Sequence, residues 1–370
     1  MMDFSFSDEQ QQLRASLRAY LRDRYPFERR RAASRSEAGW SPDVWGDFAE
    51  RLGILSLADP DMTPDPVDLM VVMEELGDAL VIEPFLETVV TGAAILRASG
   101  GDKARKLLQG IVAGEVRLAL AWAEPQTRYS WAPRETMAKQ VGPEWHLDGL
   151  KSVVTGAPWA THLIVSAATT GGTSLFVVSP DAPGVTLHAY PTIDGRRAAD
   201  VTFDSVVLDG RALLGGVGAA LPLLEQVGDA TIAAIGAEAV GVTRRMLQDT
   251  IDYAKQRQQF GQPISSFQAL QHRMVDMYMQ VEMASSAVYL ATLKLDAAPA
   301  ERIQAASVGK AVVSEACRFV GQNAVQLHGG IGMTDDLAVG HYFKRATVIE
   351  GEFGTVDHHV DRFMRARAAA

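Results

Sequence analysis

The sequence predicts an α+β fold in which a helical zone, an antiparallel β zone and a second helical zone follow one another along the chain. Three observations carry this prediction. Apolar residues recur at helical spacing up to about residue 115. Short runs rich in Val, Ile, Thr and Phe, separated by Gly, Pro and Asp, fill residues 118–210. An Ala-rich helical pattern then resumes at about residue 217.

The first zone opens with a helix start. Ser7 precedes the acidic turn Asp8–Gln10, which is typical of an N-cap, and Leu13, Leu17 and Tyr20 follow at helical spacing. We therefore expect a helix that begins after Ser7 and buries this apolar face.

The middle zone predicts a small antiparallel sandwich or barrel. The helices that a parallel Rossmann sheet needs between its strands are absent, and no GxGxxG follows a strand and opens a helix. The Gly-rich stretch Thr170–Thr173 therefore indicates a hairpin turn. The candidate strands are Trp145–Leu147, Ser152–Thr155, His162–Ala167, Ser174–Val178, Gly184–Ala189 and Ala199–Val207.

The last zone predicts a helical bundle. One apolar stripe at i, i+3, i+4, i+7 spacing favours a bundle core over a ligand site. Its members are Met274, Met277, Tyr278, Val281, Ala284 and Val288.

Composition excludes several classes of protein. The 370 residues carry a formal net charge of -10, which disfavours broad binding to nucleic acid or to an anionic membrane. Cys317 is the only cysteine, so an internal disulfide or a cysteine-built zinc site is excluded. The N-terminus lacks the apolar block of a signal peptide, and no run approaches the ~20 apolar residues of a membrane span. We expect a cytoplasmic protein.

The first segment with candidate chemistry runs from Tyr253 to Met277. Arg257 and Phe260 lie three residues apart at a predicted helix end, which Gly261 closes as a C-cap. A guanidinium beside an aromatic ring suits a phosphate next to a purine, and Gln268 adds an amide. The alternative interpretation is a salt-bridged arginine with a buried phenylalanine.

The second segment is Gln326–Gly332, which follows a predicted helix. The paired glycines Gly329 and Gly330 permit close backbone approach, so Gln326 and the exposed amides suit a nucleotide. The pair is equally typical of a helix end, and His328 is more typical of a packed or capping histidine than of a catalyst.

In this order and architecture, the two segments resemble the acyl-CoA dehydrogenase family over the whole chain. They match R-x-x-F-G followed by Q-x-x-G-G in a C-terminal four-helix bundle. The phrases AEPQTRYS, GGIGMTDDLAVGHYFKRA and FGT-DHH are similar to the small subunit of pimeloyl-CoA-type dehydrogenases. The resemblance implies an N-terminal helical domain (1–117), a middle β domain (118–212) and a C-terminal helical bundle domain (213–370).

The resemblance also implies a function. Acyl-CoA dehydrogenases use FAD to convert an acyl-CoA to the 2,3-enoyl-CoA, as dimers or tetramers, and pass electrons to an electron-transfer flavoprotein. The ADP half of the FAD is held across a subunit boundary, so that the flavin lies largely in the neighbouring subunit. The residues implied for this half are Arg257 at the pyrophosphate, Phe260 near the adenine, Gln268, Gln326 and Gly330, with Thr355 on the flavin side.

The catalytic base departs from the family pattern. A buried glutamate suits removal of the α-proton, because desolvation raises its pKa. Family members carry it in E-G-T, 27 residues after the Gln of Q-x-x-G-G. Here that position is Phe353, with Gly354 and Thr355 in register. The family's alternative base position, 26 residues before the arginine of R-x-x-F-G, is Thr231. Neither side chain is a base.

Flavin and CoA positions have changed too. The signature T-E-P-x-x-G-S-D here keeps Glu124 and Pro125 but loses the threonine and the small turn. K-x-W-I-T here has Val153 in place of the aromatic that covers the flavin, and D-x-x-R has Ile232 in place of the arginine that contacts CoA. We therefore expect the FAD-anchoring subunit of a heteromeric acyl-CoA dehydrogenase, with a second subunit supplying the glutamate.

Three alternatives stay open. The first is a homo-oligomer with a relocated base such as Glu352, although an acid there is equally typical of a solvated side chain or one paired with Arg345. Further candidates for that base are Glu350, Glu238, Asp229, Asp335 and Asp336. The second is a binding protein that has lost FAD. The third is a metal protein built on Asp357, His358, His359 and Asp361; adjacent histidines diverge on a helix, so we expect no metal site.

Overall fold

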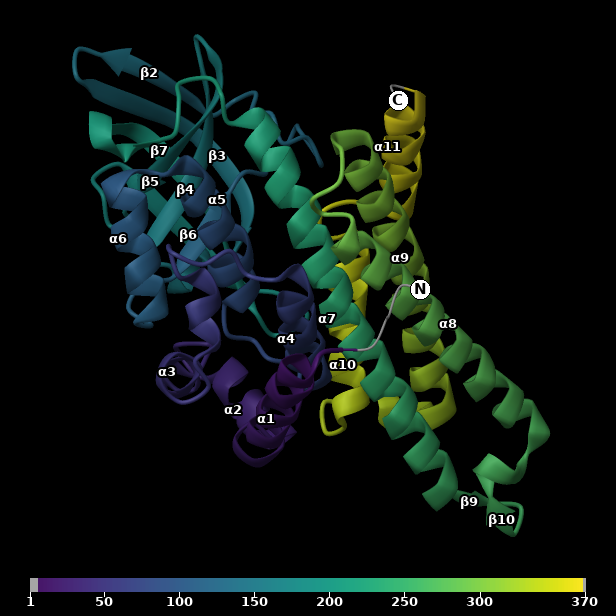
Figure 1. The fold of residues 1–370 in the computed structure, drawn as a ribbon. Coiled ribbons are helices and arrows are strands. Elements are labelled where there is room, and N and C mark those ends of the chain that lie inside the picture. Colours follow the sequence, from purple (N-terminus) through teal and green to yellow (C-terminus); the bar gives the residue numbers. More distant parts are fainter. Residues whose placement is uncertain (1–5, 369–370) are drawn as a thin grey trace. The chain divides into compact units, whose positions relative to one another are not determined.

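The computed structural model describes residues 6–368, which form two compact units, each assembled from separate stretches of the chain (Figure 1). One unit, here called the bundle unit, contains the N-terminal residues up to Ala32, Asp65–Val81 and the residues from Ile232 onward. The other, the sheet unit, contains Ala33–Pro64 and Ile82–Thr231. The N-terminal zone is thus divided between the units, and the boundaries 1–117, 118–212 and 213–370 stay a prediction.

The helices account for both helical zones of the sequence. Ser7 caps the first helix as expected: its hydroxyl accepts from the Gln10 backbone N–H, and the Gln10 side chain bonds the Ser7 N–H in return. The helices are α1 (Asp8–Arg24), α2 (Phe27–Arg35), α3 (Pro42–Glu50), α4 (Pro66–Asp78), α5 (Ala93–Ser99), α6 (Gly101–Val112), α7 (Leu221–Gln256), α8 (Gln268–Leu293), α9 (Pro299–His328), α10 (Ala338–Gly351) and α11 (Val356–Ala368).

In the bundle unit, α4 crosses α7 at two glycines with backbone against backbone. A Cβ at Gly241 of α7 would lie 2.0 Å from the carbonyl oxygen of Glu74, and one at Gly77 of α4 would lie 2.1 Å from that of Glu238. Any side chain at either position would force the helices apart. The crossing also holds Glu74 beside Arg14 of α1, at 2.7 Å, so the N-terminal helix is tied to the C-terminal bundle.

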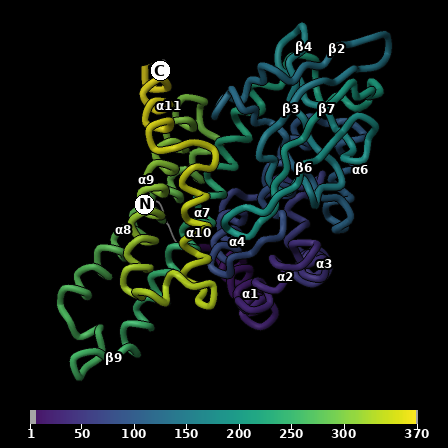
Figure 2. Tube along the Cα trace, turned by 180° about the vertical axis from the view of Figure 1, so that it is seen from behind, coloured from purple at the N-terminus to yellow at the C-terminus, as the bar shows by residue number. Residues whose placement is uncertain are grey.

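The helix α9 is the centre of the bundle, because α8, α10 and α11 all pack against it (Figures 1 and 2). The buried residues of α8 include Met277, Val281, Ala284 and Val288, which confirms most of the predicted stripe. Tyr278 differs, since it is 54% exposed. One residue is about 100° around a helix, so Tyr278 faces away from α9.

The sheet unit contains an eight-stranded sheet with the order β6-β7-β3-β2-β4-β5-β8, and β1 pairs with β4. Most pairs are antiparallel as predicted, but β1 and β2 both pair with β4 in parallel. The strands are β1 (Leu118–Ala121), β2 (Met137–Val141), β3 (Glu144–Thr155), β4 (His162–Thr169), β5 (Gly172–Val178), β6 (Val185–Pro191), β7 (Arg197–Asp209) and β8 (Leu213–Leu214).

The strand β3 joins two predicted strands, Trp145–Leu147 and Ser152–Thr155, into one. Its register against β7 shifts beside Gly149 and again between Lys151 and Val154. These irregularities interrupt the alternation of apolar and polar residues, which is why the sequence pattern read as two strands.

A buried ion pair ties β3 to the loop after β1. Glu124 accepts from Lys151 at 2.8 Å and from the backbone N–H groups of Arg134, Glu135 and Thr136. Burial raises the pKa of Glu124, but the hydrogen bonds from Lys151 and the backbone outweigh it and lower that pKa to about 2. The pair therefore fixes the course of residues 124–136 along the sheet.

Within residues 6–368, none of the helices combines the length and the apolar character that crossing a bilayer requires.

We predict that Lys151→Met destabilises the protein by about 3–5 kcal/mol, because it leaves the Glu124 carboxylate buried without a counter-charge. Urea unfolding followed by circular dichroism measures the loss. Lys139→Met, at an exposed position of β2, is the matched control and is expected to stay within about 0.5 kcal/mol of the parent. Equal losses of unfolding free energy in the two variants would contradict a stabilising role for the Glu124–Lys151 ion pair.

Candidate functional site

The first candidate segment forms a hairpin after α7. Because the Arg257 N–H bonds the Tyr253 carbonyl, α7 ends at Gln256, and β9 (Gln258–Gln259) then pairs with β10 (Gln262–Pro263). Phe260 and Gly261 occupy the turn with φ of 55° and 80°. Positive φ at both central residues is the pattern of a type I′ hairpin turn. Gly261 is therefore a turn residue, and its predicted role as a helix C-cap is wrong.

The hairpin displays its aromatic residue to solvent. Phe260 is 90% exposed, and its ring meets Phe267 edge to face with centroids 6.0 Å apart. Arg257 is exposed as well, and Gln268 is the exposed first residue of α8. The alternative of a buried phenylalanine is excluded, and the three predicted residues lie along one exposed connection between α7 and α8.

The second candidate segment closes α9. The helix ends at His328, Gly329 follows with φ of 67°, and residues Gly329–Met333 form a short 3₁₀ turn. Gln326 and Gly330 are exposed, and a Cβ at Gly330 would meet no atom within 4 Å. The glycine pair therefore ends the helix and also leaves open backbone at its surface.

A stacked pair joins the two segments. Tyr253, one turn before Arg257, stacks on His328 with ring centroids 4.4 Å apart, and its hydroxyl donates to the His328 carbonyl at 3.3 Å. His328 is buried, and its Nδ1 lies 2.8 Å from the Ala324 carbonyl oxygen. His328 is thus a packed residue. Tyr253 was missed from the sequence, although its position one helical turn before Arg257 was a usable signal.

The predicted base position lies on a separate turn between α10 and α11. Phe353 has φ of 58°, and its carbonyl oxygen lies 3.1 Å from Nε2 of buried His359. Thr355 caps α11, because its hydroxyl accepts from the His358 N–H at 3.4 Å. Burial lowers the pKa of His359 to about 3, so this imidazole is neutral.

Lys310 of α9 holds this turn in place. Its ammonium is buried and donates to the carbonyls of Glu350 and Gly354, at 3.1 and 2.8 Å, and to the Ser314 hydroxyl at 2.9 Å. Burial lowers the pKa of Lys310 to about 8. Gln326 lies 16 residues further along α9, about 24 Å at 1.5 Å per residue, so the two candidate regions occupy different parts of one helix.

The acids nearest the base position are engaged with arginines. Arg345 donates to both oxygens of buried Glu238, at 2.7 and 2.8 Å, and to Glu352 at 3.1 Å. Glu350 is paired with Arg318. Each of these carboxylates is thus held by a guanidinium, as the alternative for Glu352 predicted.

The remaining acids differ in setting. Asp335 pairs with Lys344 at 2.9 Å, and Asp336 lies 3.6 Å from Arg31. Asp229 is buried in the sheet unit. From residue 6 to residue 368 no three His, Cys, Asp or Glu side chains gather as metal ligands. Asp361 pairs with Arg365 at 2.5 Å.

The sheet unit carries the changed flavin positions. Val153 is 58% exposed with φ of 51°, and its N–H donates to Asp200 at 2.9 Å. A β-branched residue with positive φ is uncommon and indicates a constrained backbone. Trp131, from the altered loop, stacks at 4.3 Å on Trp122 and packs on α7, where a Cβ at Gly228 would lie 2.4 Å from its ring.

The chain is similar to known proteins over most of its length. The family model "Acyl-CoA dehydrogenase, C-terminal domain" matches residues 231–367, and "Acyl-CoA dehydrogenase, middle domain" matches residues 119–206. Among curated relatives, "Acyl-CoA dehydrogenase IpdE2" of Mycolicibacterium smegmatis is 30% identical over 92% of this chain and 93% of its own length.

Two solved structures are similar over nearly their whole length. A chain of a variant of the "Tcur3481-Tcur3483 steroid ACAD" has a TM-score of 0.88 and 30% identity, with 98% of each chain covered. A chain of the "ChsE4-ChsE5 complex from Mycobacterium tuberculosis" has a TM-score of 0.91 and 25% identity, with 100% of each chain covered. Each of these two names joins two proteins.

We predict that Lys310 makes stability rise with pH in the alkaline range. Its pKa is about 8 in the folded protein and near 10.5 in the unfolded chain, so the unfolded chain binds more protons between these values. The stability of the parent relative to Lys310→Met should therefore increase by about 1–3 kcal/mol from pH 8 to pH 10.5. Urea unfolding at each pH measures it.

The matched control is Lys255→Met, because the Lys255 side chain is 64% exposed. This substitution should leave the pH dependence of the unfolding free energy unchanged. If the difference in unfolding free energy between the parent and Lys310→Met stayed constant across this pH range, the pKa of Lys310 would not be lowered by folding.

Proposed function

The chain belongs to the acyl-CoA dehydrogenase family, and we propose that it is the FAD-anchoring subunit of a heteromeric member of that family. Enzymes of this family are oxidoreductases that act on the CH–CH bond of an acyl-CoA. The observation that carries the proposal is an asymmetry: the predicted nucleotide residues are exposed and joined, whereas the base position holds Phe353.

The nucleotide end of this chain fits the ADP half of FAD. Arg257 offers a guanidinium fork for a pyrophosphate, and Phe260 presents a free ring on a fixed hairpin tip for the adenine. Gln326 adds a side-chain amide and Gly330 adds open backbone. The Tyr253–His328 stack connects these two residues to the segment that carries Arg257. The Phe260 side chain is 90% exposed and so is open to contact from another subunit, as a site completed across subunits requires.

The flavin side of this chain does not fit in the same way. Val153 gives no aromatic cover, and the loop that carries a small turn in the family instead packs Trp131 on Gly228, next to Asp229. Ile232 replaces the arginine that contacts CoA. These features support an isoalloxazine and an acyl-CoA that lie in the partner subunit rather than on this chain's own sheet.

The missing base supports the same assignment. Bound FAD supplies the hydride acceptor for the β-hydrogen, but a carboxylate must also take the α-proton. Phe353 cannot, and Glu352, Glu350 and Glu238 are each held by an arginine. Loss of a general base costs roughly 10²–10⁴ in rate, so the partner subunit is proposed to provide the glutamate.

An apolar surface on α8 supports an oligomer. Several large apolar side chains of this helix are 46–55% exposed on faces turned away from α9, and such patches mark interaction surfaces. They are Val275, Tyr278, Met279, Met283, Leu290 and Leu293. The two-protein complexes among the similar structures support a second, related subunit as partner. An electron-transfer flavoprotein as acceptor and a cytoplasmic location stay predictions, as does the likeness to pimeloyl-CoA-type small subunits.

We predict that the chain purified alone is poor in flavin and nearly inactive, and that co-expression with a second acyl-CoA dehydrogenase subunit from the same organism gives a flavin-loaded, active complex. Absorbance at 450 nm per polypeptide and acyl-CoA oxidation with an artificial acceptor measure this. In the complex, Arg257→Gln should weaken FAD retention by about 10-fold or more, because it removes a charge-assisted bond to the pyrophosphate.

The control is Arg22→Gln on α1, whose side chain is 75% exposed. Full flavin occupancy together with rapid acyl-CoA oxidation by the lone chain would overturn the heteromeric proposal. A colourless complex would favour the alternative of a binding protein that has lost FAD.

A second pair of variants tests the homo-oligomer with a relocated base. Glu352→Gln should leave turnover of the complex within about 2-fold, because the Glu352 carboxylate is engaged with Arg345 rather than free to take a proton. Phe353→Glu should not make the lone chain active, since its flavin side stays incomplete. A drop of about 100-fold in Glu352→Gln would establish Glu352 as the base instead.

A further inference from the structure

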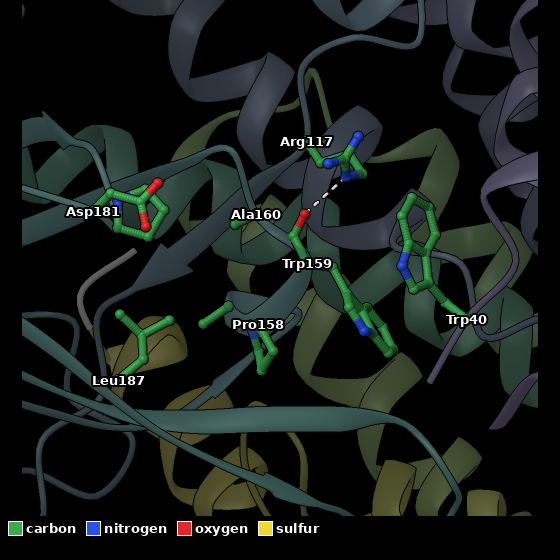
Figure 3. A pocket seen from close by; sticks show the side chains of 9 residues that line it. Trp40, Arg117, Pro158, Trp159, Ala160, Asp181 and Leu187 are labelled. Atoms are coloured by element: carbon green, nitrogen blue, oxygen red, sulfur yellow. Dashed lines mark hydrogen bonds between the residues drawn. The ribbon is translucent and has the colours of Figure 1, made fainter. Parts of the chain in front are cut away.

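A hollow in the sheet unit lies apart from every motif discussed so far. Its volume is about 460 Å³, within the range of small-molecule sites (Figure 3). None of its residues belongs to the segments that resemble nucleotide, flavin or CoA motifs. It is lined by Trp40, Arg117, Pro158, Trp159, Asp181 and Leu187, with Ala157, Ala160 and Pro180 between them.

The walls of the hollow are held by hydrogen bonds between distant parts of the sheet unit. Trp159 donates from Nε1 to the Ala38 carbonyl at 2.8 Å, which fixes the segment that carries Trp40. Gly39, with φ of 73°, lies so close to Arg197 that a Cβ there would meet its Nε at 2.5 Å. The hollow is therefore preformed rather than a gap between mobile loops.

Arg117 is the cationic residue that lines this hollow. Its Nε donates to the Trp159 carbonyl at 2.7 Å, and the guanidinium carbon lies 4.9 Å from the centre of the Trp40 ring (Figure 3). That hydrogen bond uses one of the five N–H donors of the side chain. Arg117 is half-buried, and burial lowers its pKa.

Among the residues that the structure describes, Arg117 lacks the carboxylate counter-ion that several other buried or partly buried arginines of this chain have. Arg345 is paired with Glu238, and Arg14 with Glu74. Across the described part of the chain, no carboxylate lies within salt-bridge distance of Arg117. A partly desolvated cation without a counter-ion is unfavourable, and an anion from solution would offset that cost.

We propose that this hollow binds a small monocarboxylate with an apolar body, its carboxylate on Arg117 and its body against Trp40, Pro158 and Leu187. A guanidinium fork matches a carboxylate, and the tryptophan, proline and leucine provide the apolar wall. Asp181 lines the same hollow and is exposed, so it repels an anion with two or more charges, such as a phosphate. The site does not depend on the proposed dehydrogenase role.

The test uses 4-(trifluoromethyl)benzoate as probe and the uncharged 4-(trifluoromethyl)benzamide as its matched comparison, both followed by ¹⁹F NMR on the full chain. We expect saturable binding of the benzoate that inorganic phosphate does not displace. Arg117→Gln should weaken it by about 10-fold or more, and Arg117→Lys by less, because lysine keeps the charge and loses the fork. Benzamide binding should be the same in the parent and in Arg117→Gln.

Two further variants keep the proposal falsifiable if Arg117→Gln is unstable. Asp181→Asn, at an exposed position, should tighten benzoate binding by about 2–3-fold through loss of a like charge. Arg211→Gln, whose side chain is 89% exposed in the same unit, should change nothing. No saturable binding by the parent, displacement by phosphate, or benzoate affinity unaffected by both Arg117→Gln and Asp181→Asn would each overturn the proposal.

Discussion

The contact between Tyr253 and His328 is the constraint on which the candidate site depends. It fastens the last turn of α7, which the hairpin with Arg257 and Phe260 follows, to the end of α9, which Gly329 and Gly330 follow. Neither segment meets the other through sequence proximity. Because His328 is buried and bonded within α9, the stack gives the end of α7 a fixed attachment to α9.

The helix α9 separates the base turn from the proposed nucleotide end. Lys310 and Gln326 are about 24 Å apart along that helix, so a change at the base turn leaves the nucleotide end undisturbed. The turn itself needs no acid, since Lys310 is satisfied by two carbonyls and a hydroxyl. A phenylalanine at position 353 therefore removes chemistry without removing structure.

Arginine serves two different purposes in this chain. Where it is paired, as Arg345 is with Glu238 and Glu352, it neutralises buried acids and holds helices of the bundle unit together. Where it lacks a counter-ion, at Arg117 half-buried and at Arg257 on the surface, it has hydrogen-bond donors left over, and these are the two positions for which we propose ligands. Burial and pairing together distinguish the two uses, and sequence alone shows neither.

The sequence by itself determined the three zones, the helix start at Ser7, most of the buried stripe of α8, and the absence of an acid at Phe353. These follow from local periodicity, capping chemistry and residue identity, which need no partner elsewhere in the chain. It did not determine the role of Gly261, the single strand β3, the parallel pairing of β1 with β4, or the hollow around Arg117. Each of these depends on contacts between residues far apart in the chain, and only the folded structure decides which distant groups meet.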